Sequence, residues 1–210
     1  SCSSMNLVEH TWIYKKAIPK RICNLIIQEG LTKSFDVAET GFSLNKKKSP
    51  QLNTKQNYKR IRNSEVNFFE NTPWINRLID PYIKDANEKA KWHFNIIKSE
   101  DFQFTKYGIN QHYNWHQDSF KSLYTQEHKY AGLTRKLSTS VILSDKDEYQ
   151  GGDLNFAYQN KHNKINNLKL KNLEIGTVVV FPSFLWHKVS EIKKGKRYSL
   201  VSWYLGERFK

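Results

Sequence analysis

Three side chains that commonly bind metal ions occur in an order typical of mononuclear iron sites. His116 and Asp118 are separated by one residue, and His187 follows far downstream. Two imidazoles and one carboxylate form the ligand set of non-haem Fe(II) centres, which occupies one face of the ion and leaves the other positions open. The same set could hold Zn²⁺ and support hydrolysis, although no well-placed general base accompanies it. We therefore predict that His116, Asp118 and His187 bind Fe(II).

The sequence around the second histidine predicts a rigid support for it. Residues 177–181 have the pattern of a buried strand, Pro182-Ser183 predicts a turn, and residues 186–189 return as the next strand with His187 in it. If residues 113–118 are extended, His116 and Asp118 point the same way, because side chains two apart share one face of a strand.

An arginine near the end of the chain suggests what would share the metal. Arg197 and Ser199 lie on one face of an alternating segment, ten residues after His187. An arginine facing a sheet core needs an anionic partner, and its planar fork suits a carboxylate; the alternative is an arginine at a strand edge facing solvent. We expect Arg197, with Tyr107 and Ser199, to bind the far carboxylate of 2-oxoglutarate, leaving O₂ the last metal position. Decarboxylation to succinate and CO₂ would then accompany removal of hydrogen from an unactivated C–H bond.

Two helical segments precede a strand-rich region. Residues 19–30 begin with proline and end with glycine, which predicts a short helix. Asn71-Thr72-Pro73 predicts a capped helix start, followed by an apolar stripe at helical spacing. Pro81 predicts a kink or break near Asp80, because proline removes a hydrogen bond inside a helix.

The remaining pattern predicts short strands at residues 59–69, 102–107, 137–143, 153–156, 177–181, 186–189 and 198–204. Polar segments 40–57, 119–136 and 157–169 are interpreted as loops, the last two around a barrel mouth. This order predicts a mainly β protein: a double-stranded β-helix (jelly-roll, cupin-like) packed against N-terminal α-helices. We expect one domain over residues 5–210, with a helical support region at 5–98 and the β core at 99–210.

Composition limits the remaining possibilities. The 210 residues include 38% hydrophobic and 14% aromatic residues, enough for a sizeable core. No apolar run approaches the ~20 residues of a membrane span, no secretory signal is visible, and the four residues before Met5 are interpreted as a cloning remnant. Two cysteines, Cys2 and Cys23, make no disulfide framework, so a cytoplasmic location is expected. The net charge of +14 comes largely from scattered lysines, and nucleic acid is a less favoured partner.

Several motifs resemble the 2-oxoglutarate- and Fe(II)-dependent oxygenases, most closely their prolyl 4-hydroxylase-like branch. They are Tyr107-Gly108 followed by residues 111–118, the glycine turn at 149–154, and the C-terminal signature running from Phe181-Pro182-Ser183 through His187 and Arg197 to Trp203. About half of the chain carries this resemblance closely. Many relatives have lysine where this chain has Arg197, and arginine keeps the charge while adding a fork.

The resemblance implies a double-stranded β-helix, iron binding by His116, Asp118 and His187, and 2-oxoglutarate binding by Arg197, with Tyr107 and Ser199 as further contacts. O₂ is the second co-substrate and ascorbate an expected reductant. Further pocket-lining candidates are Tyr113, Trp115, Ser138, Ser140 and Trp203, and His112 is expected on the pocket wall.

The primary substrate is less constrained than the chemistry, because a fold hosts many functions. The leading hypothesis is hydroxylation of peptidyl proline in a protein or peptide partner. The alternatives are a free amino acid or other small molecule and, less favoured, nucleic-acid demethylation or a basic nucleic-acid-binding module. Repair-type relatives usually carry a second arginine six residues after the first, where this chain has Trp203.

Overall fold

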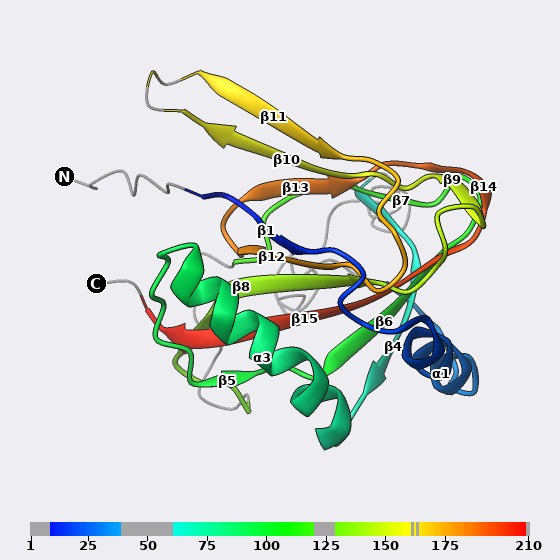
Figure 1. Ribbon diagram of the computed structural model, residues 1–210, viewed down its shortest axis with the longest axis horizontal. Helices are drawn as coiled ribbons and strands as arrows, with labels where there is room; N and C mark the ends of the chain where they lie inside the picture. Colours follow the sequence, from blue (N-terminus) through cyan, green and yellow to red (C-terminus); the bar gives the residue numbers. More distant parts are fainter. Residues whose placement is uncertain (1–8, 39–60, 120–128, 161, 163, 209–210) are drawn as a thin grey trace, which may run out of the picture.

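Antiparallel strands form two facing sheets in the computed structural model, which describes residues 9–38, 61–119, 129–160, 162 and 164–208 (Figure 1). The major sheet has the order β1 (Trp12–Tyr14), β12 (Val178–Pro182), β8 (Leu133–Ile142), β15 (Arg197–Glu207), β6 (Phe102–Tyr107), β4 (Glu65–Phe69) and β2 (Asp36–Val37), with β5 (Lys98–Ser99) beside β15. The minor sheet has the order β11 (Ile165–Leu170), β10 (Leu154–Gln159), β13 (Trp186–Val189), β7 (His112–His116) and β3 (Arg62–Asn63). A short ribbon pairs β14 (Ile192–Gly195) with β9 (Tyr149–Gly151).

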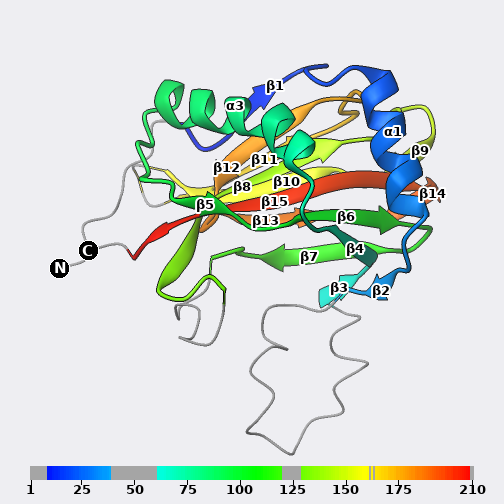
Figure 2. The same ribbon diagram turned by 90° about the horizontal axis from the view of Figure 1, so that it is seen from below.

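Two apolar layers hold these elements together. The inner layer lies between the sheets and includes Phe156, Phe181 and Ile192. The outer layer joins the other face of the major sheet to the helices α1 (Lys20–Leu31) and α3 (Pro73–Lys89), which lie on one side of that sheet in Figure 2. This architecture is the mainly β, helix-supported jelly roll that the strand and turn pattern predicts. The region before residue 99 also contributes strands to both sheets, so it is more than a helical support.

The helix α3 differs from its prediction at two points. It continues through Pro81 without a break. Ile79 and Ile83, two residues before and after the proline, are fully buried against the sheet, and this packing offsets the roughly 3 kcal/mol that an internal proline costs. Thr72 also makes no side-chain cap, because its hydroxyl donates back to the carbonyl of Phe69 at 3.0 Å.

Three other predicted segments turn out differently. Residues 59–69 are not one strand: Ser64 separates β3 in the minor sheet from β4 in the major sheet. Most of residues 157–169 is not a loop, because β10 and β11 form a hairpin there. Residues 133–136 belong to β8, whereas the predicted loop at 40–57 and residues 120–128 lie outside the described part of the chain.

No helix in the described ranges is both long and apolar enough to cross a bilayer.

Candidate metal centre

The three residues expected to bind iron come from both strands of one antiparallel pair and the segment after it. His116 is the last residue of β7, and its Cα pairs with that of His187 on β13. Asp118 follows two residues later, and its backbone N–H donates to the carbonyl of Ser183 at 2.8 Å. One ligand atom from each of the three residues lies within 4.8 Å of the others, and the group is the one candidate metal cluster found among the described residues.

The orientation of both imidazoles suits metal binding. The Nδ1 atom of His116 lies 2.7 Å from the carbonyl of Asn114, and that of His187 lies 2.8 Å from the carbonyl of Leu185. Each Nδ1 can donate to its carbonyl only as N–H, which leaves the lone pair on Nε2. Both Nε2 atoms lie 3.4 Å from a carboxylate oxygen of Asp118. The three donor atoms therefore face a common point.

The surroundings of the site favour its metal-binding charge state. Burial, followed by repulsion from His187, lowers the pKa of His116 to about 4. Burial alone would raise the pKa of Asp118, but His187 and His116 outweigh it and hold that pKa well below its ordinary value. Near neutral pH, His116 is therefore uncharged and Asp118 is ionised, the forms that bind a divalent cation.

A second layer of contacts fixes the ligands. The Ser138 hydroxyl donates to Oδ2 of Asp118 at 2.7 Å and also contacts the Ser183 hydroxyl at 2.9 Å. The ring of Tyr113 stacks on His116 with a centroid distance of 3.4 Å. Such partners usually orient ligands and increase metal affinity. Ser138 and Tyr113 are among the predicted pocket residues, whereas no feature of the sequence singled out Ser183 as a partner.

Arg197 is buried beside this site without a negative partner. Its side chain is among the largest that are fully buried, at 1% exposure. Nη1 donates to Ser199 at 3.3 Å, whereas Nε has no hydrogen-bond partner, and no ion pair of Arg197 occurs in the described residues. The guanidinium carbon lies 5.6 Å from the ring centre of Tyr107, which lines the pocket with the triad. The alternative of a solvent-facing arginine is wrong.

The backbone next to Arg197 leaves room for its stem. Gly152 has φ +64°, and a Cβ at that position would lie 2.8 Å from Cδ of Arg197. The glycine turn at residues 149–154 therefore serves two purposes: it adopts a backbone conformation that disfavours L side chains, and it admits the arginine.

Two predicted wall residues lie elsewhere, and two unpredicted arginines lie close to the site. Trp115 is on the opposite face of β7, under the ammonium group of Lys188, and His112 contacts Asn110 outside the pocket lining. Arg62 is 6% exposed and lies over the ring of Tyr113. Arg135 forms a two-pronged ion pair with Glu100 at 2.6 and 2.7 Å and covers the ring of Trp203. The predicted strand at residues 59–69 was the one sequence signal that included Arg62. No local pattern indicated the ion pair between Arg135 and Glu100.

The pocket beside the triad is lined by an apolar wall and by many side chains that carry a polar group. Ser140, Trp203, Phe181 and Val189 line it together with Tyr107 and Tyr113. Three buried side-chain atoms in the described part of the chain lack a hydrogen-bond partner, and two of them, Nε of Arg197 and Nε1 of Trp203, belong to this region. Buried donors without partners are uncommon in folded proteins. An acceptor-rich ligand in this region would satisfy both of them.

Comparison with known proteins gives the same family on independent grounds. Residues 102–205 match the family model of the 2OG-Fe(II) oxygenase superfamily. A PKHD-type hydroxylase of Prochlorococcus marinus (strain MIT 9515) is 29% identical over 152 residues, which are 71% of this chain and 58% of that protein. The chain thus spans less than two thirds of this curated relative.

Solved structures share the fold at low sequence identity. A prolyl-4-hydroxylase of Pseudomonas putida superposes with a TM-score of 0.64 at 15% identity, covering 97% of this chain and 96% of the other. A prolyl hydroxylase from Trichoplax adhaerens, in complex with a hypoxia inducible factor peptide fragment, gives a TM-score of 0.65 at 16% identity, covering 94% of this chain and 84% of the other. These likenesses show a shared fold, and the family match over residues 102–205, which include both histidines, shows that the chain belongs to the 2OG-Fe(II) oxygenase superfamily.

Proposed function

We propose that this chain is a 2-oxoglutarate- and Fe(II)-dependent hydroxylase. His116, Asp118 and His187 would hold the metal, and Arg197, with Ser199 and Tyr107, would bind the far carboxylate of 2-oxoglutarate. With O₂, the bound pair supplies an oxidant for an unactivated C–H bond, and 2-oxoglutarate leaves as succinate and CO₂. A reducing compartment such as the cytoplasm fits Cys23, a buried free thiol.

The observation that carries the proposal is the buried, partly unsatisfied Arg197. A buried guanidinium without an acid is costly, yet this one lies 5.6 Å from the ring centre of Tyr107, which lines the pocket of the three convergent metal-binding side chains. A dicarboxylate that chelates the metal at one end and reaches Arg197 with the other resolves both features. Zinc-dependent hydrolysis would leave this cation unexplained.

We further propose that the primary substrate is peptidyl proline. The two prolyl hydroxylases named above share the fold over nearly the whole chain, and one of them is seen with a bound peptide. A free amino acid or another small molecule remains the second candidate. The two candidates need pockets of different shape. A peptide continues past the reacting residue on both sides, so its pocket must be open at two ends, whereas a small molecule can be fully enclosed.

Succinate release and oxygen incorporation, measured together, test both proposals. The iron-loaded protein is incubated with 2-oxoglutarate and either proline-containing peptides or a panel of free amino acids, and products are weighed by mass spectrometry. We expect one oxygen atom to be added to a peptide, in step with succinate. The His116→Ala variant should lose metal and turnover. The matched His112→Ala variant, on the same strand but outside the pocket lining, should retain both.

The outcomes separate the two levels of the proposal. Oxygen addition only to free amino acids would contradict the peptide assignment and leave the hydroxylase class intact. An absence of metal-dependent 2-oxoglutarate binding would overturn the class itself. Equal activity of the His116→Ala and wild-type proteins would show that the metal is held elsewhere.

A further inference from the structure

The solvent side of β10, β11 and β13, which we call the outer face, is chemically different from the inner side that carries the metal site. Side chains alternate along β13: His187 and Val189 are buried inside, whereas Trp186 and Lys188 face out. The strand register aligns the outer residues in rows. Asn155 of β10 is paired with Lys169 on one side and Lys188 on the other, and the next row contains Ala157 and Trp186.

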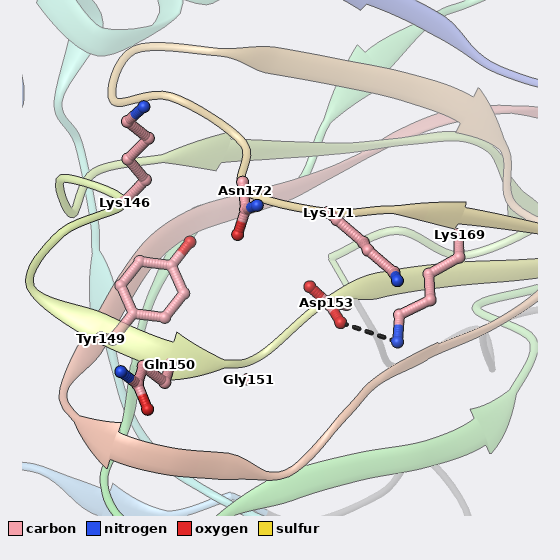
Figure 3. A pocket seen from close by; sticks show the side chains of 8 residues that line it. All are labelled: Lys146, Tyr149, Gln150, Gly151, Asp153, Lys169, Lys171 and Asn172. Atoms are coloured by element: carbon pink, nitrogen blue, oxygen red, sulfur yellow. Dashed lines mark ion pairs between the residues drawn. The ribbon is translucent and has the colours of Figure 1, made fainter.

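Positive charge continues from these rows into a hollow at one end of the outer face. The hollow has a volume of about 270 Å³, and its lining includes Lys146, Lys169 and Lys171. Figure 3 shows Lys169 and Lys171 at one end of it and Lys146 at the other, with the side chain of Asn172 between them. The lysines are thus strung along a path rather than gathered around one point, which suits an extended anion better than a compact one.

The lining of the hollow carries little negative charge. The only acid in the hollow's lining is Asp153, and its carboxylate already pairs with Lys169 at 3.0 Å. The sequences of β10, β11 and β13 contain no acidic residue. With Lys188, four lysines face one aspartate, which gives a net charge of +3 (four minus one) within a molecule of net charge +14.

Aromatic rings lie beside the cations. The indole of Trp186 is 49% exposed, one row from Lys188. The ammonium group of Lys188 lies 4.8 Å from the ring centre of Trp115 on the neighbouring strand. An exposed aromatic ring beside lysines is a combination that binds single strands, because a base stacks on the ring while phosphates meet the cations.

We propose that the outer face binds single-stranded nucleic acid, with backbone phosphates along the lysine path and a base on Trp186. An acidic peptide would use the lysines, but only an occasional side chain of it could pack on the indole, whereas every nucleotide carries a base that can stack. This surface and the metal site lie on opposite sides of the same sheet, so the binding does not depend on the proposed hydroxylase activity.

Anisotropy of a labelled oligothymidine of about 20 nucleotides, titrated with the full chain at several salt concentrations, tests the proposal. We expect saturable binding whose logarithmic salt slope is about −2, since each phosphate contact contributes about −0.7 for a single strand and one of the four lysines, Lys169, is already paired with Asp153. The Lys171→Ala/Lys188→Ala double variant should flatten the slope by about 1.4. Trp186→Ala should weaken binding roughly 5- to 150-fold, the range of one lost stacking contact, without changing the slope.

Matched controls distinguish a site from diffuse charge. The Lys15→Ala/Lys84→Ala variant removes the same charge from exposed positions elsewhere, and Phe68→Ala removes another exposed aromatic ring. Both should bind like the wild type. Losses as large as those of the outer-face variants would overturn the proposal, as would equal affinity for a duplex of the same length, whose bases cannot stack on Trp186. Binding to phosphatidylserine vesicles without binding to the oligonucleotide would overturn it in favour of a membrane surface.

Discussion

Replacing Arg197 with methionine should make the ligand-free protein more stable while removing co-substrate binding. The arginine is 1% exposed, and its Nε lacks a partner. A buried donor left without a partner costs about 1–3 kcal/mol. Methionine has a similar length and no donors, and it adapts to irregular spaces such as that beside Gly152. We therefore expect Arg197→Met to raise the free energy of unfolding by about 1–3 kcal/mol in the absence of 2-oxoglutarate.

The effect on 2-oxoglutarate binding should have the opposite sign. The guanidinium can offer two hydrogen bonds to the carboxylate, each worth about 1.5–3 kcal/mol because the partners are charged. Their sum is about 3–6 kcal/mol, so the dissociation constant should rise roughly 10²- to 10⁴-fold. A structural arginine would not show this combination of a more stable protein and a weaker complex.

Urea unfolding with and without 2-oxoglutarate measures both effects, with Mn²⁺ in place of iron to prevent turnover. At a concentration near 100 times its dissociation constant, 2-oxoglutarate should stabilise the wild type by about 2.7 kcal/mol. It should stabilise Arg197→Met by no more than about 0.4 kcal/mol. Arg77→Met, at an exposed position of α3, is the matched control and should respond like the wild type. If the ligand-free Arg197→Met protein is less stable than the wild type, or keeps its affinity for 2-oxoglutarate, the assignment of this side chain is wrong.

Three further changes test the surroundings of the site and the core. Ser138→Ala removes the hydroxyl that donates to Asp118, and Mn²⁺ affinity measured by calorimetry should fall about 10- to 100-fold. Tyr204→Phe removes the 2.9 Å hydrogen bond to Asp80 and should lower the free energy of unfolding at neutral pH by about 1 kcal/mol. Burial, and then Asp80, raise the pKa of Tyr204 well above its ordinary value, so this stabilisation should be present below about pH 10 and decline above it; a flat difference between the two proteins across that range would contradict this. Burial also raises the pKa of Cys23 to about 11, so in a Cys2→Ser background no thiol should react with an alkylating reagent near pH 8 until the protein unfolds.

The positions of His187 and Arg197 could be predicted because the sequence patterns that indicate them are local. His187 could be placed because a buried strand, a Pro-Ser turn and a returning strand are adjacent in sequence, and the structure has β12 and β13 there. Arg197 could be placed on an inward face because alternation along a single strand requires no knowledge of its neighbours. Both inferences depend on strand periodicity, which the sequence carries directly.

The predictions failed where pairing with a distant strand determines the structure of a segment. Residues 165–169 were interpreted as part of a polar loop because most of their side chains face solvent at the edge of the sheet, yet backbone pairing with β10 makes them a strand. Arg62 lies about 50 positions before His116 in the sequence and reaches the site because β3 pairs with β7. No local sequence pattern indicates that pairing. Long-range pairing of this kind is set by the assembled sheets rather than by propensity.

The register of β7 against β13 shows why the motif geometry could not be worked out from alternation alone. Regular pairing would put Tyr113 and His116, three residues apart, on opposite faces. The pairing shifts between His187–His116 and Val189–Tyr113, so β7 contains one extra residue. This bulge turns both rings inward, where they stack 3.4 Å apart, and turns Trp115 outward beside Lys188. One irregular residue therefore places Tyr113 against His116, a proposed metal ligand, on the inner side, and it places Trp115 on the outer face. For this reason the prediction for Trp115 was wrong, whereas His116 does lie in the metal cluster.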